Sequence, residues 1–161
     1  MTNGSPRRTL AGFTLLEVMI TVVIVGILAS IALPSYNYFI TRSRITEATN
    51  TLSNMRTQME KWFMDHRTYD DGTGKCGIEA NPPNLIANYN ADANNKFTIS
   101  CPAITQGTYT LRATGAGAMS GFEYEINQLN AKTTTALPTS KGWTLPSPST
   151  CWVLRKDGGC S

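Results

Sequence analysis

The chain has 161 residues, of which 41% are hydrophobic and 16% are charged, and its formal net charge is +3 at pH 7. This length allows one modest domain beside a membrane-type segment, and the abundance of Gly, Thr, Asn, Ser and Pro favours a β-rich, loop-rich body over a helical bundle. The small positive charge and the lack of a Lys/Arg cluster interleaved with aromatic residues give no support for nucleic-acid binding, so we expect no nucleic-acid partner.

The first element in the chain is an apolar run over residues 10–33, which is about long enough to span a bilayer. Glu17 lies inside this run, and Arg7 and Arg8 precede it. An ionised carboxylate in hydrocarbon costs about 3 kcal/mol on insertion scales, so Glu17 needs a partner or a function. Because positive charges before a span keep that end cytoplasmic, the C-terminal part is predicted to lie outside the cytoplasm.

Three interpretations of this run differ in what they imply for Glu17. A cleaved secretory signal would end at residues 30–32, Ser-Ile-Ala, and an uncleaved anchor would keep the whole run. Neither interpretation gives Glu17 a partner. In the third, cleavage between Gly12 and Phe13 creates a new α-amino group, and Glu17 lies one helical turn further on, near a helix N-terminus that favours a carboxylate. Glu17 of one subunit then meets the ammonium group of a neighbour within the membrane, and the two costly charges neutralise each other.

The residues that support the third interpretation resemble the N-terminal signature of the type IV pilins and of their relatives, the type II secretion pseudopilins. Residues 12–18, Gly-Phe-Thr-Leu-Leu-Glu-Val, follow a short basic leader and open the apolar run. The resemblance implies cleavage after Gly12 by a prepilin peptidase, N-methylation of Phe13, and a role for Glu17 in assembly. It also implies three regions: a leader (1–12), a transmembrane and filament-core helix (13–33), and a periplasmic or extracellular globular domain (34–161).

The helical pattern continues beyond residue 33 as an apolar stripe at alternating spacings of three and four: Ile45, Ala48, Leu52, Met55, Met59 and Trp62. We therefore expect one helix from about Phe13 to about Arg67, with its first half in lipid and its second half packed under the globular body. Gly26 and Pro34 interrupt this helix, and the proline predicts a kink around residues 31–34. The pilin resemblance implies that the stretch from Gly26 to Pro34 unwinds when the subunit enters a filament.

The region after the helix is predicted to be a loop over residues 72–95, because it is rich in Asn, Pro and Gly, with Asn-Pro-Pro-Asn at residues 81–84. Alternating apolar and polar residues then predict strands with one buried face at residues 97–101, 109–113 and 122–127, with residues 133–137 as a candidate fourth. The expected fold class is α+β, the pilin fold. In it, the long N-terminal helix packs on a small antiparallel β-meander followed by a disulfide-bounded C-terminal loop.

All four cysteines follow the apolar run: Cys76, Cys101, Cys151 and Cys160. An even count in an exported region favours disulfides, and the lack of a CxxC pair or Cys/His cluster argues against zinc. Of three possible pairings, Cys76–Cys101 with Cys151–Cys160 closes the shortest loops and is favoured. The second pair would bound a loop that resembles the C-terminal disulfide region of pilins, with a role as a structural staple or, alternatively, as a partner contact.

No catalytic constellation is evident in the sequence. His66, the only histidine, lies near the predicted helix end, where a capping or packing role is favoured. Residues 70–72, Asp-Asp-Gly, could imitate a loose calcium site together with Asn88, Asn90 and Asp92, but their spacing does not match an EF-hand loop. Residues 116–118 lack the strand and helix of a phosphate-binding loop. We expect no enzymatic activity, no metal and no cofactor.

The function expected from these features is that of a structural subunit of a type IV pilus, most like a minor pilin of the PilE kind. It would act in pilus assembly or initiation, and hence in adhesion and twitching motility. Its expected partners are other major and minor pilins, the prepilin peptidase, the inner-membrane assembly machinery and membrane lipid. It would lie in the bacterial inner membrane as a single-pass protein with a cytoplasmic N-terminus, and later in the periplasm and the surface pilus. The alternatives are a type II secretion pseudopilin and an exported soluble binding domain with an ordinary signal peptide.

Overall fold

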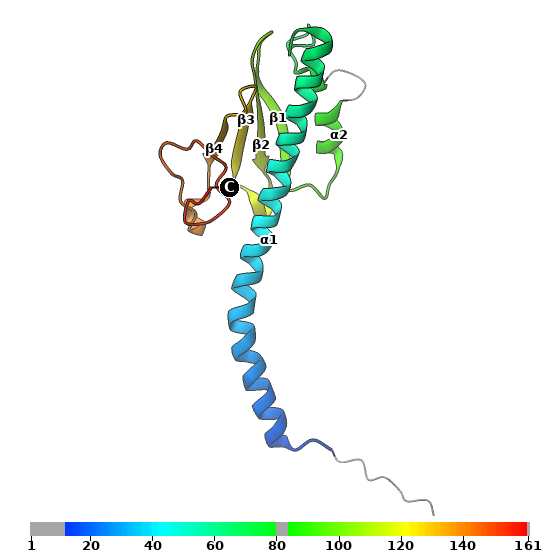
Figure 1. The fold of residues 1–161 in the computed structure, drawn as a ribbon. Coiled ribbons are helices and arrows are strands. Elements are labelled where there is room, and N and C mark those ends of the chain that lie inside the picture. The colour runs from blue at the N-terminus through cyan, green and yellow to red at the C-terminus, as the bar shows by residue number, and fades with distance from the viewer. Residues whose placement is uncertain (1–11, 80–83, 161) are drawn as a thin grey trace, which may run out of the picture. The chain divides into compact units, whose positions relative to one another are not determined.

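The computed structural model describes residues 12–79 and 84–160, and it divides into two compact units, Met1–Phe39 and Ile40–Ser161 (Figure 1). Most of the predicted leader and residues 80–83 of the predicted loop lie outside the described residues. The elements in chain order are α1 (Leu15–His66), η1 (Gly77–Glu79), α2 (Leu85–Ala91), β1 (Phe97–Ile104), β2 (Tyr109–Gly115), η2 (Gly117–Met119), β3 (Glu123–Asn127), β4 (Lys132–Ala136) and η3 (Thr139–Lys141).

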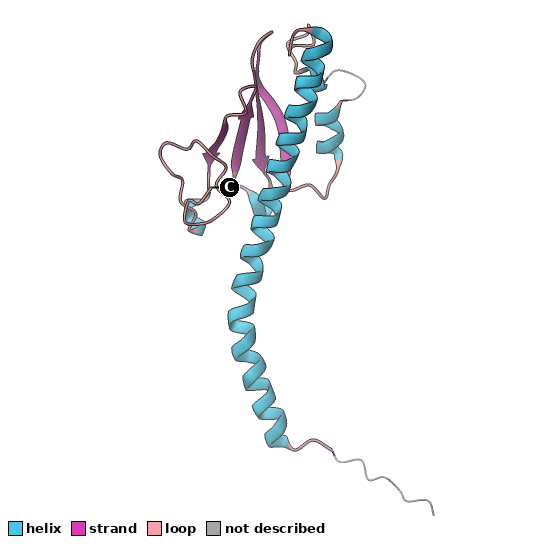
Figure 2. Ribbon diagram, in the orientation of Figure 1, coloured by secondary structure: helices cyan, strands magenta, loops and turns pink. Residues whose placement is uncertain are grey.

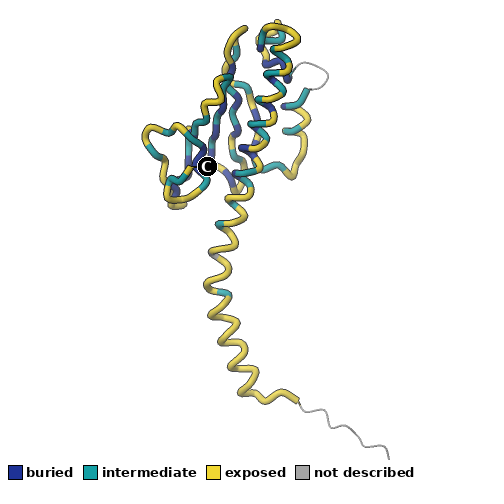
Figure 3. The backbone as a smooth tube through the Cα atoms, viewed as in Figure 1, coloured by how far each residue is buried: buried dark blue, intermediate teal, exposed yellow. Residues whose placement is uncertain are grey.

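The first unit contains the N-terminal part of α1, which has the composition of a membrane span. An 18-residue window of this helix has a mean hydropathy of 2.6 and contains no buried residue (Figure 3). Within the described residues, α1 is the one helix long and apolar enough to cross a membrane. The hydroxyls of Thr21 and Ser30 donate hydrogen bonds to the carbonyls of Val18 and Ile27, at 2.8 and 2.7 Å, so the helix itself satisfies these polar groups.

Gly26 and Pro34 both lie inside α1, and helical structure continues through the stretch between them. Proline has no backbone N–H, so the carbonyl of Ser30 receives no helical hydrogen bond from that position. Glycine is a weak helix former. The stretch is therefore helical in this structure, and its unwinding during assembly stays a prediction.

In the second unit, the predicted apolar stripe of α1 forms one side of the core. Ile45, Ala48, Leu52 and Met59 are fully buried. Figure 2 shows this part of α1 running along the strands, and the hydrogen bonds that connect α1 to β2 and to the β3–β4 turn confirm that contact. The other side of the core consists of alternate residues of the strands, which are also fully buried: Ile99, Tyr109, Leu111, Tyr124 and Ile126. Each such side chain contributes about 1.5–3 kcal/mol by its burial.

The described strands form a four-stranded antiparallel sheet in the order β1-β2-β3-β4, which confirms the predicted meander and its candidate fourth strand. The register places Leu111 opposite Ile126 on the core face and Arg112 opposite Glu125 on the outer face. Arg112 and Glu125 form an ion pair at 2.6 Å. The alternation in the sequence thus predicted which residues face the core, because side chains of a strand point to opposite faces in turn.

The helix α2 is a correction to the predicted loop over residues 72–95. Asn84 caps α2, since its side-chain oxygen accepts a hydrogen bond from the backbone N–H of Ala87 at 2.8 Å. Within α2, the side chain of Asn90 donates to the carbonyl of Ile99 and accepts from the N–H of Ile99, both at 2.8 Å. Asn90 therefore pairs with the outer edge of β1 as another strand would. A helix of seven residues is too short for its periodicity to stand out among asparagines.

Both predicted disulfides are present. Cys76–Cys101 links the segment after α1 to strand β1, and Cys151–Cys160 closes a loop with a sequence separation of 9. Inside this loop, the N–H of Leu154 donates to the carbonyl of Gly159 at 3.0 Å. The connectivity predicted from loop length is therefore confirmed.

Replacing Cys151 by serine is expected to lower the free energy of unfolding by about 2–3 kcal/mol, because the open loop regains chain entropy in the unfolded state. Denaturant unfolding under non-reducing conditions measures the change. Thr150→Ala, at the exposed neighbouring position, is the control and is expected to change stability by less than about 0.5 kcal/mol. A variant with an unfolding curve identical to that of the unmodified protein would show that the pair contributes nothing.

Candidate functional site

The predicted processing and assembly residues lie at the start of α1. Phe13 precedes the helix and is 81% exposed. A shallow cavity of about 330 Å³ is lined by Phe13, Glu17, Val18 and Thr21, so the structure brings the predicted new N-terminus and Glu17 together on one side of the helix.

Thr14 holds the beginning of this helix and was missed in the sequence analysis. Its hydroxyl oxygen accepts a hydrogen bond from the backbone N–H of Glu17 at 3.2 Å. The spacing Thr-x-x-Glu is that of a capping box, which was the available signal. Thr14 therefore fixes the first turn and, with it, the position of Glu17 relative to Phe13.

Glu17 has no cationic partner within the described part of the chain, where the ion pairs involve other residues. Its surroundings on α1 are exposed apolar side chains. In lipid, this carboxylate would be left without compensation in an isolated subunit, so it is available for a charge supplied by another chain.

His66 has the packing role that the sequence favoured. Its imidazole stacks on the indole of Trp62, with ring centroids 3.7 Å apart and an interplanar angle of 9°. Its Nδ1 lies 3.1 Å from the carbonyl oxygen of Trp62. Directly after His66, Arg67 adopts a φ of 60°, a left-handed conformation that ends α1 close to the predicted position.

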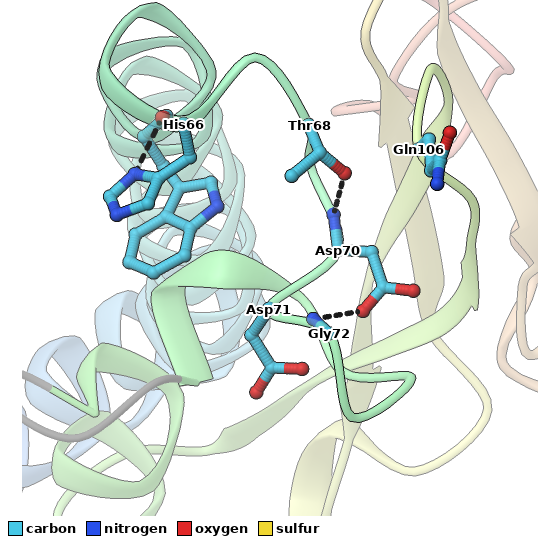
Figure 4. A pocket seen from close by; sticks show the side chains of 7 residues that line it. His66, Thr68, Asp70, Asp71, Gly72 and Gln106 are labelled. Atoms are coloured by element: carbon cyan, nitrogen blue, oxygen red, sulfur yellow. Dashed lines mark hydrogen bonds between the residues drawn. The ribbon is translucent and has the colours of Figure 1, made fainter.

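A second cavity, of about 270 Å³, lies beside this ring stack (Figure 4). Its lining residues come from the end of α1, from the following loop and from the β1–β2 turn: Trp62, His66, Thr68, Asp70, Asp71, Gly72 and Gln106. Figure 4 shows the ring of His66 on one side and Thr68, Asp70 and Gln106 on the other. The sequence placed no site here, because the β1–β2 turn is distant in the chain.

The two aspartates of this cavity organise the loop that carries them. Asp70 Oδ1 accepts hydrogen bonds from the N–H groups of Gly72 and Gly74, at 2.8 and 3.1 Å. Asp71 Oδ1 accepts from the N–H groups of Thr73 and Lys75, at 2.8 and 3.2 Å. Burial acts to raise the pKa of Asp71, but the hydrogen bonds from Thr73 and Lys75 and the charge of Lys75 outweigh it and lower the pKa below its usual value. In the described residues, no three His, Cys, Asp or Glu side chains are arranged to hold a metal.

Hydrogen bonds to the carboxylate of Glu60 connect α1 to the sheet. The hydroxyls of Tyr69 and Tyr109 donate to its two carboxylate oxygens, at 2.9 and 3.0 Å. Arg56 lies 4.0 Å from the same carboxylate and donates to the carbonyl of Gln128 at 3.2 Å. The sequence analysis did not predict the two tyrosine contacts, because they depend on the tertiary fold.

The raised pKa values of two tyrosines in the second unit predict that the free energy of unfolding falls at alkaline pH. Burial raises the pKa of Tyr109 above 10.0, with a further contribution from Glu60, and burial raises the pKa of Tyr124. A raised folded-state pKa means that these phenols stabilise the fold fully below pH 10 and progressively less as the pH rises above it, since the unfolded chain releases its protons first. Unfolding free energies measured against pH test this expectation. Full ionisation of all six tyrosines near pH 10 in the folded protein, followed by tyrosinate absorbance, would contradict it.

The C-terminal loop is anchored to the sheet mainly through Thr134. The hydroxyl of Thr134 donates to the carbonyl of Cys151 at 2.7 Å and accepts from the N–H of Val153 at 2.9 Å. The hydroxyl of Tyr124 donates to the carbonyl of Val153 at 3.0 Å. These bonds support the staple role of the loop, while Arg155 and Lys156 remain exposed on it.

Comparison with known families assigns the chain to a class. A family profile described as "Type IV minor pilin ComP, DNA uptake sequence receptor" matches residues 34–136, and a prokaryotic N-terminal methylation motif matches residues 7–33. The chain thus has the two parts of a type IV pilin, an N-terminal methylation segment and a pilin body. It belongs to the ComP family of type IV minor pilins. Proteins of this class are structural subunits, and the methylation motif with the apolar helix fits a pilin anchored in the inner membrane.

Individual relatives are also type IV pilins. A type IV major fimbrial protein FimA of Dichelobacter nodosus is 34% identical over 125 residues, which cover 77% of this chain and 69% of that protein. The major pilin PilE1 of Neisseria gonorrhoeae is 31% identical over 78 residues, covering 48% and 47%. A probable minor fimbrial protein of D. nodosus is 37% identical over 81 residues, covering 50% and 51%. The chain thus spans between about half and two-thirds of the length of these relatives.

Among solved structures, the non-core minor pilin PilV of Neisseria meningitidis matches with a TM-score of 0.46 and 14% sequence identity, covering 62% of this chain and 90% of that chain. The relatives named PilE1 are described as major pilins, whereas the family profile describes minor pilins. Membership of the type IV pilins is common to both.

Proposed function

We propose that this chain is a minor subunit of a type IV pilus that is processed between Gly12 and Phe13 and enters the filament through Glu17. The observation that carries the proposal is the position of Glu17, which lies without a cationic partner among the described residues, in one cavity with exposed Phe13 on a membrane-type helix. The methylation motif over residues 7–33 supports the same processing site.

The processing step supplies the missing positive charge. Cleavage after Gly12 by a prepilin peptidase leaves an α-ammonium group at Phe13, which stays charged when it is N-methylated. The cleavage also removes Arg7 and Arg8, so the formal net charge falls from +3 to +1. Glu17 of one subunit then pairs with the ammonium group of its neighbour in the membrane, and this contact sets the axial stagger between the two helices.

The proposed location follows from the charges and the disulfides. Before assembly the leader end is cytoplasmic, residues 13–33 span the inner membrane, and residues 34–161 lie on the outer side, where disulfides form. The stretch from Gly26 to Pro34 unwinds as the subunit leaves the bilayer. In the pilus, the partners are other major and minor pilins and the inner-membrane assembly machinery, and the proposed roles are pilus initiation, adhesion and twitching motility.

Mass spectrometry of sheared surface filaments tests this proposal. The expected result is a mature chain that begins at methylated Phe13 and is present in fewer copies than the major pilin. A chain that begins at Leu33 would instead support an exported domain with an ordinary signal peptide. A deletion that blocks protein secretion but leaves surface piliation normal would support a type II secretion pseudopilin.

A second candidate function is DNA binding, which the description of the matching family suggests. Arg155 and Lys156 on the C-terminal loop, together with Lys141, are exposed cations that a phosphate backbone could contact. Residues 40–161 carry 12 Lys and Arg against 10 Asp and Glu, so the overall charge gives little additional attraction. DNA binding therefore ranks second, and the earlier expectation of no nucleic-acid partner is still to be tested.

Gel-shift titration of the full-length protein in detergent with a short DNA duplex measures this second function. Binding that weakens with salt and is reduced in the double variant Arg155→Ala, Lys156→Ala would support it. A control variant, Lys75→Ala, changes an exposed lysine on a different loop. Equal binding by the control and the double variant would place the DNA contact elsewhere.

A further inference from the structure

The cavity at the end of α1 has no part in the assembly contact at Glu17, and its two walls differ in chemistry. One wall is the ring stack of Trp62 and His66. His66 is exposed and lines the cavity, and only one of its faces is occupied by Trp62. The exposed imidazole therefore has a second face that a ligand can stack on.

This aromatic wall is held rigidly from behind. A Cβ atom added at Gly77 would clash with the ring of Trp62, so the ring packs directly on the backbone of Gly77. The contact between His66 Nδ1 and the carbonyl of Trp62 fixes the second ring. A surface that is already ordered loses little conformational entropy when a ligand binds to it.

The rest of the lining is mostly polar, and it includes the carboxylates of Asp70 and Asp71. In the described residues, the hydrogen bonds that Asp70 and Asp71 accept all go to their Oδ1 atoms. The Oδ2 atom of each carboxylate therefore has no donor from this part of the protein. Gln106, from the β1–β2 turn, adds a side-chain amide to the same wall.

Charge and shape together select the ligand. Two carboxylates repel phosphate and other anions, so this cavity disfavours a nucleic-acid backbone. A lysine ammonium group satisfies the carboxylates but cannot stack on the imidazole. A guanidinium group does both, because it is planar, always positively charged, stacks on aromatic rings and donates hydrogen bonds in its plane to carboxylates.

We propose that this cavity binds an arginine side chain of a partner protein, with the guanidinium group stacked on His66 and hydrogen-bonded to Asp70 and Asp71. The site gives the subunit a second contact, outside the membrane-spanning residues 13–33, that does not depend on Glu17. The inference goes beyond the proposed pilus function, because it rests only on the walls of the cavity.

Nuclear magnetic resonance of the full-length protein in detergent tests the proposal, with the indole N–H of Trp62 as the reporter. The probe is N-acetyl-arginine amide, and the matched probe is N-acetyl-citrulline amide, which has nearly the same shape but no charge. We expect a saturable shift with the arginine probe. The affinity for the citrulline probe should be lower by about tenfold or more, since a charge-assisted hydrogen bond is lost. Equal binding of the two probes would overturn the proposal.

The variant Asp70→Asn tests the carboxylate wall without removing the Oδ1 acceptor that Gly72 and Gly74 use. It is expected to weaken binding of the arginine probe by about tenfold. The control is Asp92→Asn, because Asp92 also accepts a local backbone hydrogen bond, from Asn94, but lies outside the cavity. Unchanged binding by Asp70→Asn would contradict the proposal. A shift of the Trp62 indole resonance with a short DNA duplex but not with the arginine probe would also contradict it. If a variant fails to fold, the comparison of the two probes on the unmodified protein decides the matter.

Discussion

Replacing Glu17 by alanine is expected to leave cleavage after Gly12 largely intact and to reduce incorporation into filaments by roughly a hundredfold. The size follows from the cost of about 3 kcal/mol for an uncompensated charge in hydrocarbon, since each 1.4 kcal/mol is a factor of ten. The incoming ammonium group at Phe13 would find no carboxylate on its neighbour. N-terminal sequencing reports cleavage, and immunoblotting of sheared filaments reports incorporation.

The control for this experiment is Thr21→Ala, which changes another polar residue of the same cavity. The hydroxyl of Thr21 is satisfied by the carbonyl of Val18 within the helix, so its loss should not affect assembly. Normal incorporation of the Glu17 variant would refute the proposed contact. An equal defect in both variants would indicate damage to the helix surface instead of the loss of a charge.

Replacing Glu60 by alanine is expected to destabilise the second unit by about 3 kcal/mol, because the hydroxyls of Tyr69 and Tyr109 lose their acceptor at positions shielded from water. Both hydroxyls now donate to this one carboxylate. Urea unfolding followed by tryptophan fluorescence measures the change. Glu47→Ala is the matched control, since Glu47 lies on the same helix in an exposed pair with Arg44, and should cost less than about 0.5 kcal/mol.

The cost at Glu60 has a specific remedy if this explanation is correct. Adding Tyr69→Phe to the Glu60 variant removes a donor that has no acceptor, and should restore part of the lost stability. The reason is that removing both partners of a hydrogen bond costs much less stability than leaving one of them buried and unpaired. The same single change in the unmodified protein should destabilise it. If Tyr69→Phe costs the same in both backgrounds, then the hydroxyl and Glu60 do not interact.

Much of the fold could be predicted from local patterns. The apolar stripe of α1 and the alternation in Tyr109, Leu111 and Ala113 each follow from a fixed geometric period. The structure buries these residues accordingly, except Trp62 at the end of the stripe, which is half-buried. The disulfide pairing could be predicted from loop length, since each bond joins two consecutive cysteines of the chain. The helix end near Arg67 followed from the turn-forming residues after it.

The remaining features depend on contacts between distant parts of the chain. Glu60 looks like an ordinary helix-surface residue, and only the fold places Tyr109 against it. Thr134 looks like one threonine among several in β4, yet it holds the C-terminal loop. The cavity beside His66 needs Gln106 from the β1–β2 turn, so no sequence window contains it. By contrast, the missed cap at Thr14 was local and could have been found.

The pairing of Asn90 with Ile99 has a consequence for a protein of a class whose members pack against other pilins. The sheet has two lateral borders, at β1 and at β4. The amide of Asn90 engages the first, and the hydroxyl of Ser149 accepts from the N–H of Thr134 at the second. Because these backbone groups are already hydrogen-bonded, the edge strands of neighbouring globular domains have little opportunity to pair with each other and form an amyloid-like aggregate.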